Sequence, residues 1–221
     1  MQAMDIGLVG LGVMGENLAL NLERHGFSVA GFDLDASKRE NFAQRTRGLR
    51  AQAAATLAEL VASLSVPRRL WLMVPAGAAV DQVLAQLTPL LSPGDVLIDG
   101  GNTLYTDTQR RIAALQGSGI LYVGAGVSGG EEGALRGPAL MPGGSPEAWP
   151  LVKPLLQAIA AKAVFPAVDV FHDGSTYYLA DGFHRCITGA VQWVLLFGHG
   201  GYSFKTTASG FSGRHRDWHS Y

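Results

Sequence analysis

The feature that most constrains the fold of this chain is a glycine-rich turn near its amino terminus, at residues 10–15. The turn directly follows an apolar run at 6–9 and opens a segment, 14–25, in which apolar residues recur at helical spacing. A Gly-x-Gly-x-x-Gly between a strand and a helix is typical of dinucleotide binding. Gly10 would make the tight turn, Gly12 would let the backbone approach a pyrophosphate, and Gly15 would let helix and strand pack closely. The pattern predicts contacts to NAD or NADP from Gly10, Leu11, Gly12, Val13, Met14 and Gly15.

Strand-like and helix-like segments alternate along most of the chain. Continuous apolar runs predict strands at 6–9, 28–32, 70–74, 96–98 and 120–123. Helical periodicity predicts helices at 14–25, 36–46, 57–64, 80–91 and 104–115. Apolar runs without alternation indicate strands buried on both faces, as in parallel sheets covered by helices. We therefore expect an α/β fold, with a Rossmann-like doubly wound, mainly parallel sheet and helices on both faces.

An acidic residue follows the second predicted strand, where a cofactor ribose would lie. Asp33 comes 18 residues after Gly15, close to the spacing of about 20 at which a carboxylate accepts hydrogen bonds from a ribose 2′-hydroxyl. Such a carboxylate would repel a 2′-phosphate, so Asp33 favours NAD over NADP. Asp33 can instead be a simple turn residue, and Lys38 or Arg39 can neutralise a 2′-phosphate, so the cofactor preference stays open.

Charge and cysteine content narrow the expected partners and location. There are 17 Lys and Arg against 18 Asp and Glu, a net charge of −1, which gives no reason to expect nucleic acid or an anionic membrane as partner. Cys186 is the only cysteine, which excludes an intrachain disulfide and favours a cytoplasmic location. We expect no signal peptide and no membrane span, because the longest late apolar run, 187–197, is too short to cross a bilayer.

Further motifs carry a resemblance to a known family. Asp-Gly-Gly-Asn at 99–102 and Gly-Val-Ser-Gly-Gly-Glu-Glu-Gly at 126–133 each follow a predicted strand, and the second runs into a glycine- and proline-rich stretch at 136–144. Together with the glycine turn, this ordered set resembles 6-phosphogluconate dehydrogenase, of the β-hydroxyacid dehydrogenase superfamily, over about residues 4–162.

The resemblance implies an activity and a set of binding residues. The reaction would be the NAD(P)-dependent oxidative decarboxylation of 6-phosphogluconate to ribulose 5-phosphate, a step of the pentose phosphate pathway. Further cofactor contacts would come from Val74, Pro75, Ala76 and Asn102. The substrate would contact Asn102, Ser128, Gly129 and Gly130. A Ser-Gly-Gly turn suits an anion because it exposes N–H groups and a hydroxyl, although 128–133 can also be a plain surface loop.

Two positions depart from the pattern common in NADP-using members of this family. Asp33-Leu34-Asp35 stands where Asn-Arg-Thr is usual, so the arginine that would grip a 2′-phosphate is missing. Val-Pro-Ala-Gly at 74–77 stands where Val-Lys-Ala-Gly is usual. Both changes favour NAD, or the use of both cofactors.

The family's catalytic segment is not recognisable. Its general-base Lys would fall near residue 185, where the chain reads Phe183-His184-Arg185, and no lysine occurs between Lys162 and Lys205. The acidic Glu and the all-helical domain that forms most of the dimer are also absent, and His184 is better explained as an unrelated residue. We identify no catalytic residue, expect this truncated chain to be inactive alone, and leave its oligomeric state open.

The composition changes near residue 164, so we expect a Rossmann domain at 1–164 and an atypical tail at 165–221. An Asp-Gly turn at 173–174 between strand-like runs predicts a β-hairpin. Residues 168–185 are similar to the start of a ParB/sulfiredoxin-type domain, which makes a non-catalytic nucleotide-binding module, with a partner- or nucleotide-binding tail, the alternative function. A complete short member acting on another 3-hydroxyacid is a third alternative. His215 and His219 lack a third ligand, so we predict no metal site.

Overall fold

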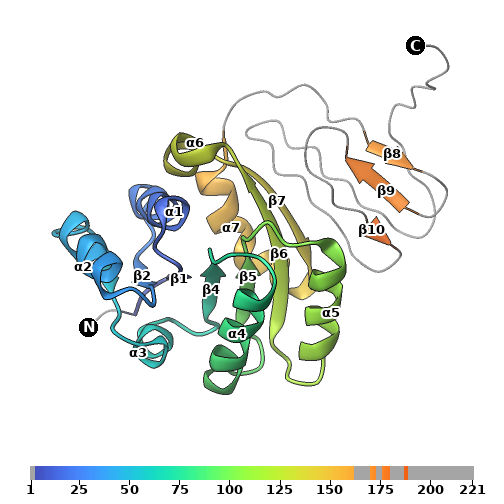
Figure 1. Ribbon diagram of the computed structural model, residues 1–221, viewed down its shortest axis with the longest axis horizontal. Helices are drawn as coiled ribbons and strands as arrows, with labels where there is room; N and C mark the ends of the chain where they lie inside the picture. The colour runs from blue at the N-terminus through green and yellow to red at the C-terminus, as the bar shows by residue number, and fades with distance from the viewer. Residues whose placement is uncertain (1–2, 162–169, 173–175, 180–186, 189–221) are drawn as a thin grey trace, which may run out of the picture.

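The computed structural model describes residues 3–161 and, further along the chain, the backbone of 170–172, 176–179 and 187–188. Residues 3–161 form one twisted sheet with helices packed on it (Figure 1). The seven strands are β1 (Ile6–Val9), β2 (Val29–Phe32), β3 (Ala51–Ala53), β4 (Arg69–Leu72), β5 (Val96–Asp99), β6 (Leu121–Ser128) and β7 (Ala139–Gly144).

The strand order is β3-β2-β1-β4-β5-β6-β7. The first six strands pair in parallel, in registers such as Ile6↔Val29 between β1 and β2, and β7 pairs antiparallel with β6. The chain reverses its direction of travel across the sheet between β1 and β4, because β2 and β3 lie on one side of β1 and the later strands on the other. This order confirms the predicted doubly wound, mainly parallel sheet.

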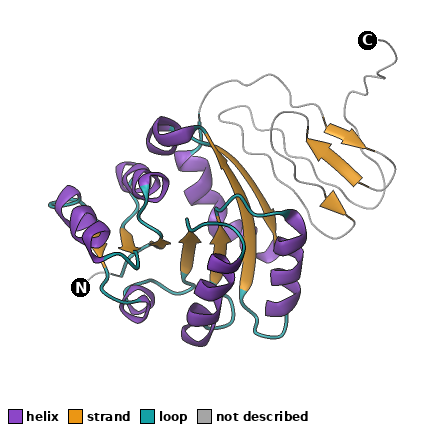
Figure 2. Ribbon diagram, in the orientation of Figure 1, coloured by secondary structure: helices purple, strands orange, loops and turns teal. Residues whose placement is uncertain are grey.

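Helices cover both faces of the sheet (Figure 2). They are α1 (Val13–Arg24), α2 (Ala36–Arg45), α3 (Leu57–Ala62), α4 (Ala78–Leu87), α5 (Tyr105–Leu115), α6 (Gly130–Arg136) and α7 (Trp149–Ile159). Side chains of α1, α2, α6 and α7 join one apolar core, and side chains of α3, α4 and α5 join the other. Strand β4 serves both cores, because Trp71 packs into the first and its neighbours Leu70 and Leu72 into the second.

Several elements differ from the sequence-based expectation. The helix expected over 80–91 ends at Leu87 and continues as a 3₁₀ turn, Thr88–Leu90, since Pro89 has no N–H to continue the α-helical ladder. Strand β6 extends to Ser128, beyond the expected 120–123. Four elements were not predicted: β3, β7, α6 and α7. Helix α7 was missed although its buried residues Val152, Leu155, Leu156 and Ile159 recur at helical spacing. Strand β7 contains a proline and two glycines, which are atypical of strands.

A second, antiparallel sheet of order β10-β9-β8 is formed by β8 (Val170–His172), β9 (Thr176–Leu179) and β10 (Ile187–Thr188). Strands β8 and β9 pair with Val170 opposite Leu179, on either side of the predicted turn. The turn itself, at 173–174, lies outside the described residues, as do the expected boundary near 164 and His184, Cys186, His215 and His219. No helix of the described part of the chain is long and apolar enough to cross a membrane.

Candidate functional site

The reversal point of the sheet brings two loops together at the carboxyl ends of the strands. The turn after β1 lies against the segment after β4, since the Met73 N–H donates to the Val9 carbonyl at 2.7 Å. A Cβ atom added to Gly10 would stand 2.4 Å from the Met73 carbonyl oxygen. In open α/β sheets this crevice, outside the carboxyl ends of the strands, is where ligands bind.

Two of the three glycines in the turn are required by the fold itself. Gly10 has a φ of +99°, a conformation that L side chains rarely adopt, and it has no room for a Cβ. A Cβ on Gly15 would stand 1.9 Å from the Gly10 carbonyl oxygen, so Gly15 allows α1 to pack against the turn. These two contacts have the geometry that the fingerprint predicts for the first and third glycines.

The middle glycine is different, because the fold does not need it. Gly12 has an ordinary φ of −70°, and a Cβ there would meet nothing within 4 Å apart from its own neighbours in the chain. The space in front of Gly12 is therefore open, and it lies at the amino end of α1. Gly12 caps this helix without a side-chain hydrogen bond to its first turn. The amino end of a helix presents N–H groups and partial positive charge, which suit a phosphate.

Asp33 is tied to the glycine turn from the end of β2. Its Oδ2 accepts the Leu11 N–H at 2.8 Å, and its Oδ1 accepts the Asp35 N–H at 2.9 Å. The Asp33 side chain is only 12% exposed, and Lys38 Nζ lies 3.7 Å from Oδ2. Asp33 therefore braces the turn, a role that its position in the sequence did not reveal. Each carboxylate oxygen has a second lone pair with which it can accept a ribose hydroxyl.

The residues beside Asp33 determine the charge of the surface around its carboxylate. Leu34 is 80% exposed and presents an apolar side chain there. Arg39 Nη1 donates to the carbonyls of Asp33 at 2.7 Å and Leu34 at 3.1 Å, and its guanidinium lies 5.8 Å from the ring centroid of Phe32. Asp35 caps α2, and hydrogen bonds from Ser37 lower the pKa of its carboxyl. Both nearby cations, Lys38 and Arg39, thus already contact groups of the loop that follows β2.

The loops after β4 and β5 also touch. A Cβ on Gly101 would stand 3.1 Å from the Val74 carbonyl oxygen, so the predicted cofactor segment at 74–76 lies beside the turn that carries Asn102. The Gly100 N–H donates to the Leu72 carbonyl at 2.9 Å, which holds that turn against β4. Pro75, Ala76 and Asn102 are all exposed at this edge.

The predicted substrate segment is not a plain surface loop. Ser128 is the last residue of β6, Gly129 is the amino cap of α6 with a φ of +132°, and Gly130 opens that helix with a φ of +62°. Parallel pairing places Asp99 opposite Gly124, so Ser128 lies four residues further along than the end of β5. Asn102, which follows β5, and Ser128, which ends the neighbouring β6, thus lie at one edge of the sheet.

Helix α6 is in turn held by α1, the helix that the glycine turn opens. Asn21 of α1 donates from Nδ2 to the carbonyls of Ala134 at 3.0 Å and Ile159 at 3.3 Å. Arg24 donates to the Leu135 carbonyl. The segment that starts at Ser128 is thus anchored on α1, the helix that Gly12 caps. Within the described residues, no group of three His, Cys, Asp or Glu could hold a metal ion.

The sequence of this chain is similar to those of known proteins. A family described as the NAD binding domain of 6-phosphogluconate dehydrogenase matches residues 5–171. A decarboxylating 6-phosphogluconate dehydrogenase of Treponema pallidum is 51% identical over 215 residues, which cover 96% of this chain and 43% of that protein. The Dictyostelium discoideum enzyme of the same name is 50% identical over 195 residues, 86% of this chain and 40% of that protein. The chain therefore spans about two-fifths of the length of these relatives.

A solved structure agrees with these matches. The 6-phosphogluconate dehydrogenase of Plasmodium falciparum, determined in its apo form, with its cofactor NADP+ and with its substrate 6-phosphogluconate, superimposes with a TM-score of 0.69 at 37% identity. The overlap covers 72% of this chain and 34% of that one. With the sheet order, the glycine turn and the family match in agreement, this chain belongs to the family of NAD-binding domains of 6-phosphogluconate dehydrogenase.

Proposed function

We propose that this chain is the cofactor-binding part of a decarboxylating 6-phosphogluconate dehydrogenase and that it binds NAD(H) at the glycine turn. The observation that carries the proposal is the contrast among the three glycines. The fold requires Gly10 and Gly15 but leaves open space in front of Gly12, at the positive end of α1. A dinucleotide pyrophosphate has the charge to occupy that space.

The same geometry suggests how the cofactor lies across the edge of the sheet. The adenosine ribose would reach Asp33 at the end of β2, on one side of the pyrophosphate. The nicotinamide half would extend the other way, toward Val74, Pro75, Ala76 and Asn102. Bound NAD(P)+ supplies the hydride acceptor, and the residues of this chain bind and orient it.

We further propose that NAD is preferred over NADP. A 2′-phosphate would meet the Asp33 carboxylate, the Asp35 carboxylate and the exposed apolar side chain of Leu34. Lys38 is paired with Asp33, and Arg39 is held by backbone carbonyls, so a phosphate would have to draw them from existing partners. The P. falciparum relative, in contrast, was solved with NADP+.

Fluorescence titrations with NADH and NADPH test both the site and the preference. We expect tighter NADH binding by the unaltered chain. Because Leu34 is exposed, Leu34→Arg should leave the fold intact and strengthen NADPH binding by about tenfold or more, as a charge-assisted phosphate contact does. The matched control is Leu49→Arg, which adds the same charge at a leucine that is also exposed.

Three outcomes of these titrations would count against the proposals. If the chain binds neither NADH nor NADPH, the proposed cofactor site is refuted. Tighter NADPH binding by the unaltered chain would refute the NAD preference, and an equal gain in Leu49→Arg would show that net charge alone is responsible.

For the substrate, we propose that 6-phosphogluconate approaches Asn102, Ser128, Gly129 and Gly130, the residues that the family resemblance indicates. The support is their common edge of the sheet, together with the positive φ values of the two glycines, which suit a turn that presents N–H groups to an anion. The P. falciparum relative was solved with this substrate. A cytoplasmic location stays a prediction.

A further inference from the structure

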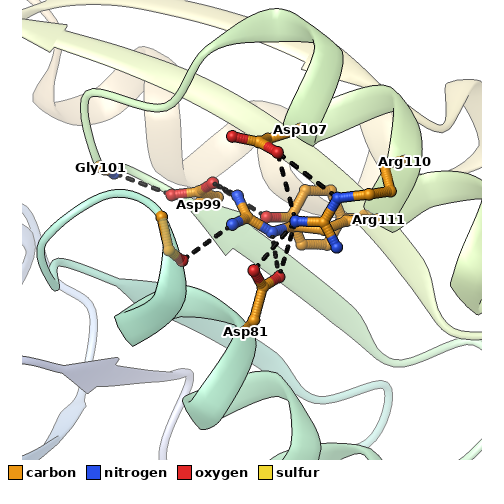
Figure 3. Close-up of polar contacts among 8 residues, drawn as sticks. Asp81, Asp99, Gly101, Asp107, Arg110 and Arg111 are labelled. Carbon is orange, nitrogen blue, oxygen red and sulfur yellow. Dashed lines mark hydrogen bonds and ion pairs between the residues drawn. The ribbon is translucent and has the colours of Figure 1, made fainter.

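A buried arginine joins the two loops that flank the proposed nicotinamide half of the site. Arg111, on α5, is 2% exposed, and its guanidinium donates to three acceptors on different elements (Figure 3). Nε donates to Asp81 Oδ1 at 2.8 Å, Nη1 to Asp99 Oδ2 at 3.3 Å, and Nη2 to the Gly77 carbonyl at 3.0 Å. The planar fork of an arginine can hold three acceptors in fixed directions, which an ammonium cannot do.

Each acceptor leads to one of the two loops. Gly77 is the last residue of the Val74–Gly77 loop and the amino cap of α4, and Asp81 lies in the first turn of that helix. Asp99 ends β5, and its other oxygen, Oδ1, accepts the Gly101 N–H at 3.0 Å, inside the turn that carries Asn102. One guanidinium therefore sets the distance between the 74–77 loop and the 100–102 turn.

The protonation states of the groups around Arg111 favour a fixed geometry. The hydrogen bond from Arg111 lowers the pKa of Asp81 to about 2, so this carboxylate stays ionised at neutral pH. Burial raises the pKa of Tyr122, so its hydroxyl stays protonated and donates to Asp99 Oδ2 at 2.9 Å. Fully buried Asp99 thus has hydrogen-bond donors on both oxygens.

Stability alone is a poor explanation for this arrangement. Burying a guanidinium and a carboxylate carries a large desolvation penalty, and well-packed apolar side chains of similar volume are often at least as stabilising. Arg110, the preceding residue on α5, pairs with the same Asp81 from the exposed side, with its side chain 54% exposed. Arg110 therefore already connects α5 with Asp81 of α4. The hydrogen bonds from α5 to Asp99 and to the Gly77 carbonyl, in contrast, come from Arg111.

We infer that Arg111 is a positioning residue for the nicotinamide half of the cofactor, acting through the 74–77 loop and the 100–102 turn. The inference rests on the proposed cofactor site. The adenosine half, at Asp33 and Gly12, belongs to loops that Arg111 does not contact in these hydrogen bonds. A change at Arg111 should therefore weaken contacts to the nicotinamide ribose and ring and spare those to ADP-ribose.

Calorimetric titration with NADH and with ADP-ribose tests this inference. In Arg111→Lys, which keeps the charge and loses the fork, NADH should bind about fivefold or more weakly, with ADP-ribose within about twofold of the unaltered chain. Arg110→Lys is the matched control, one residue away, and should change neither affinity. If Arg111→Lys loses cooperative unfolding, Asp99→Asn provides the second variant. The amide keeps the side-chain volume but replaces one of the two oxygens that accept from Arg111 and from the Gly101 N–H, so it breaks the connection between Arg111 and the 100–102 turn.

The outcomes separate this inference from the proposed function. Binding of neither ligand by the unaltered chain would refute the cofactor site itself. If the unaltered chain binds both, an equal loss for NADH and ADP-ribose, or no loss in Arg111→Lys, would overturn the role of Arg111. If Asp99→Asn replaces it, an unchanged ratio of the two affinities would do the same.

Discussion

At the residue scale, the three glycines of one motif are needed for different physical reasons. Gly10 and Gly15 are required by backbone contacts within the domain, whereas Gly12 faces open space. The fingerprint assigns the three glycines these different roles by their position in the motif. The structure separates them by what an added Cβ would meet.

This difference predicts opposite results for two alanine variants. Gly12→Ala should change the free energy of unfolding by no more than about 1 kcal/mol, because its φ suits alanine, yet weaken NADH binding by about tenfold or more. Gly15→Ala should destabilise the fold, because its Cβ would overlap the Gly10 carbonyl. Urea unfolding and NADH titration of both variants would check this. Unchanged NADH affinity in Gly12→Ala would contradict the assigned role.

At the element scale, α1 both borders the proposed pyrophosphate site and holds two other helices. Its amino end faces the proposed pyrophosphate site, and its inner face carries the buried Asn21. The Asn21 amide donates to carbonyls near the carboxyl ends of α6 and α7, where the last carbonyls of a helix lack partners in the helix. One side chain thus stabilises two helix ends and connects α1 with the predicted substrate segment.

We therefore expect Asn21→Ala to lower the free energy of unfolding by about 1–3 kcal/mol, the cost of leaving buried carbonyls unsatisfied. Asn41→Ala, at an exposed asparagine of α2, is the matched control and should change it by less than about 0.5 kcal/mol. Equilibrium urea unfolding measures both. Equal effects of the two variants would show that these hydrogen bonds contribute little.

At the scale of the whole molecule, the order of the strands assembles the site. Asp33, Gly12, Val74 and Asn102 are far apart in the chain, yet all follow strands whose carboxyl ends share one edge of the sheet. The parallel pairing produces this, because every βα unit returns its next strand in the same direction. Arg111 then sets the distance between the 74–77 loop and the 100–102 turn.

For this chain on its own, we expect cofactor binding without turnover. The family's general-base lysine has no counterpart between Lys162 and Lys205, and loss of proton transfer alone slows a reaction by about 10²–10⁴-fold. Incubation with 6-phosphogluconate and NAD+ should therefore give no increase in the absorbance of reduced nicotinamide beyond that of a blank without substrate. A complete 6-phosphogluconate dehydrogenase in the same assay is the positive control, and turnover at its rate would contradict the expectation.

Local patterns were enough to predict the glycine turn, the buried strands and the type of sheet. These depend on short-range chemistry: backbone freedom at glycine, apolar periodicity and the need to cover both faces of a parallel strand. The same reasoning failed for β7 and α6, whose glycine-rich sequences carry little periodicity and which form because β6 and α1 lie beside them.

Sequence patterns were sufficient to predict that this chain builds a parallel sheet with a glycine turn at the start of a helix, and to show which family it resembles. Three contacts became visible in the folded chain alone: Asp33 braces that turn, Asn21 holds α6, and Arg111 joins two loops. The reason is physical. These contacts join residues 12 to 138 positions apart, and their distances are set by the packing of helices on the sheet, which no local pattern encodes.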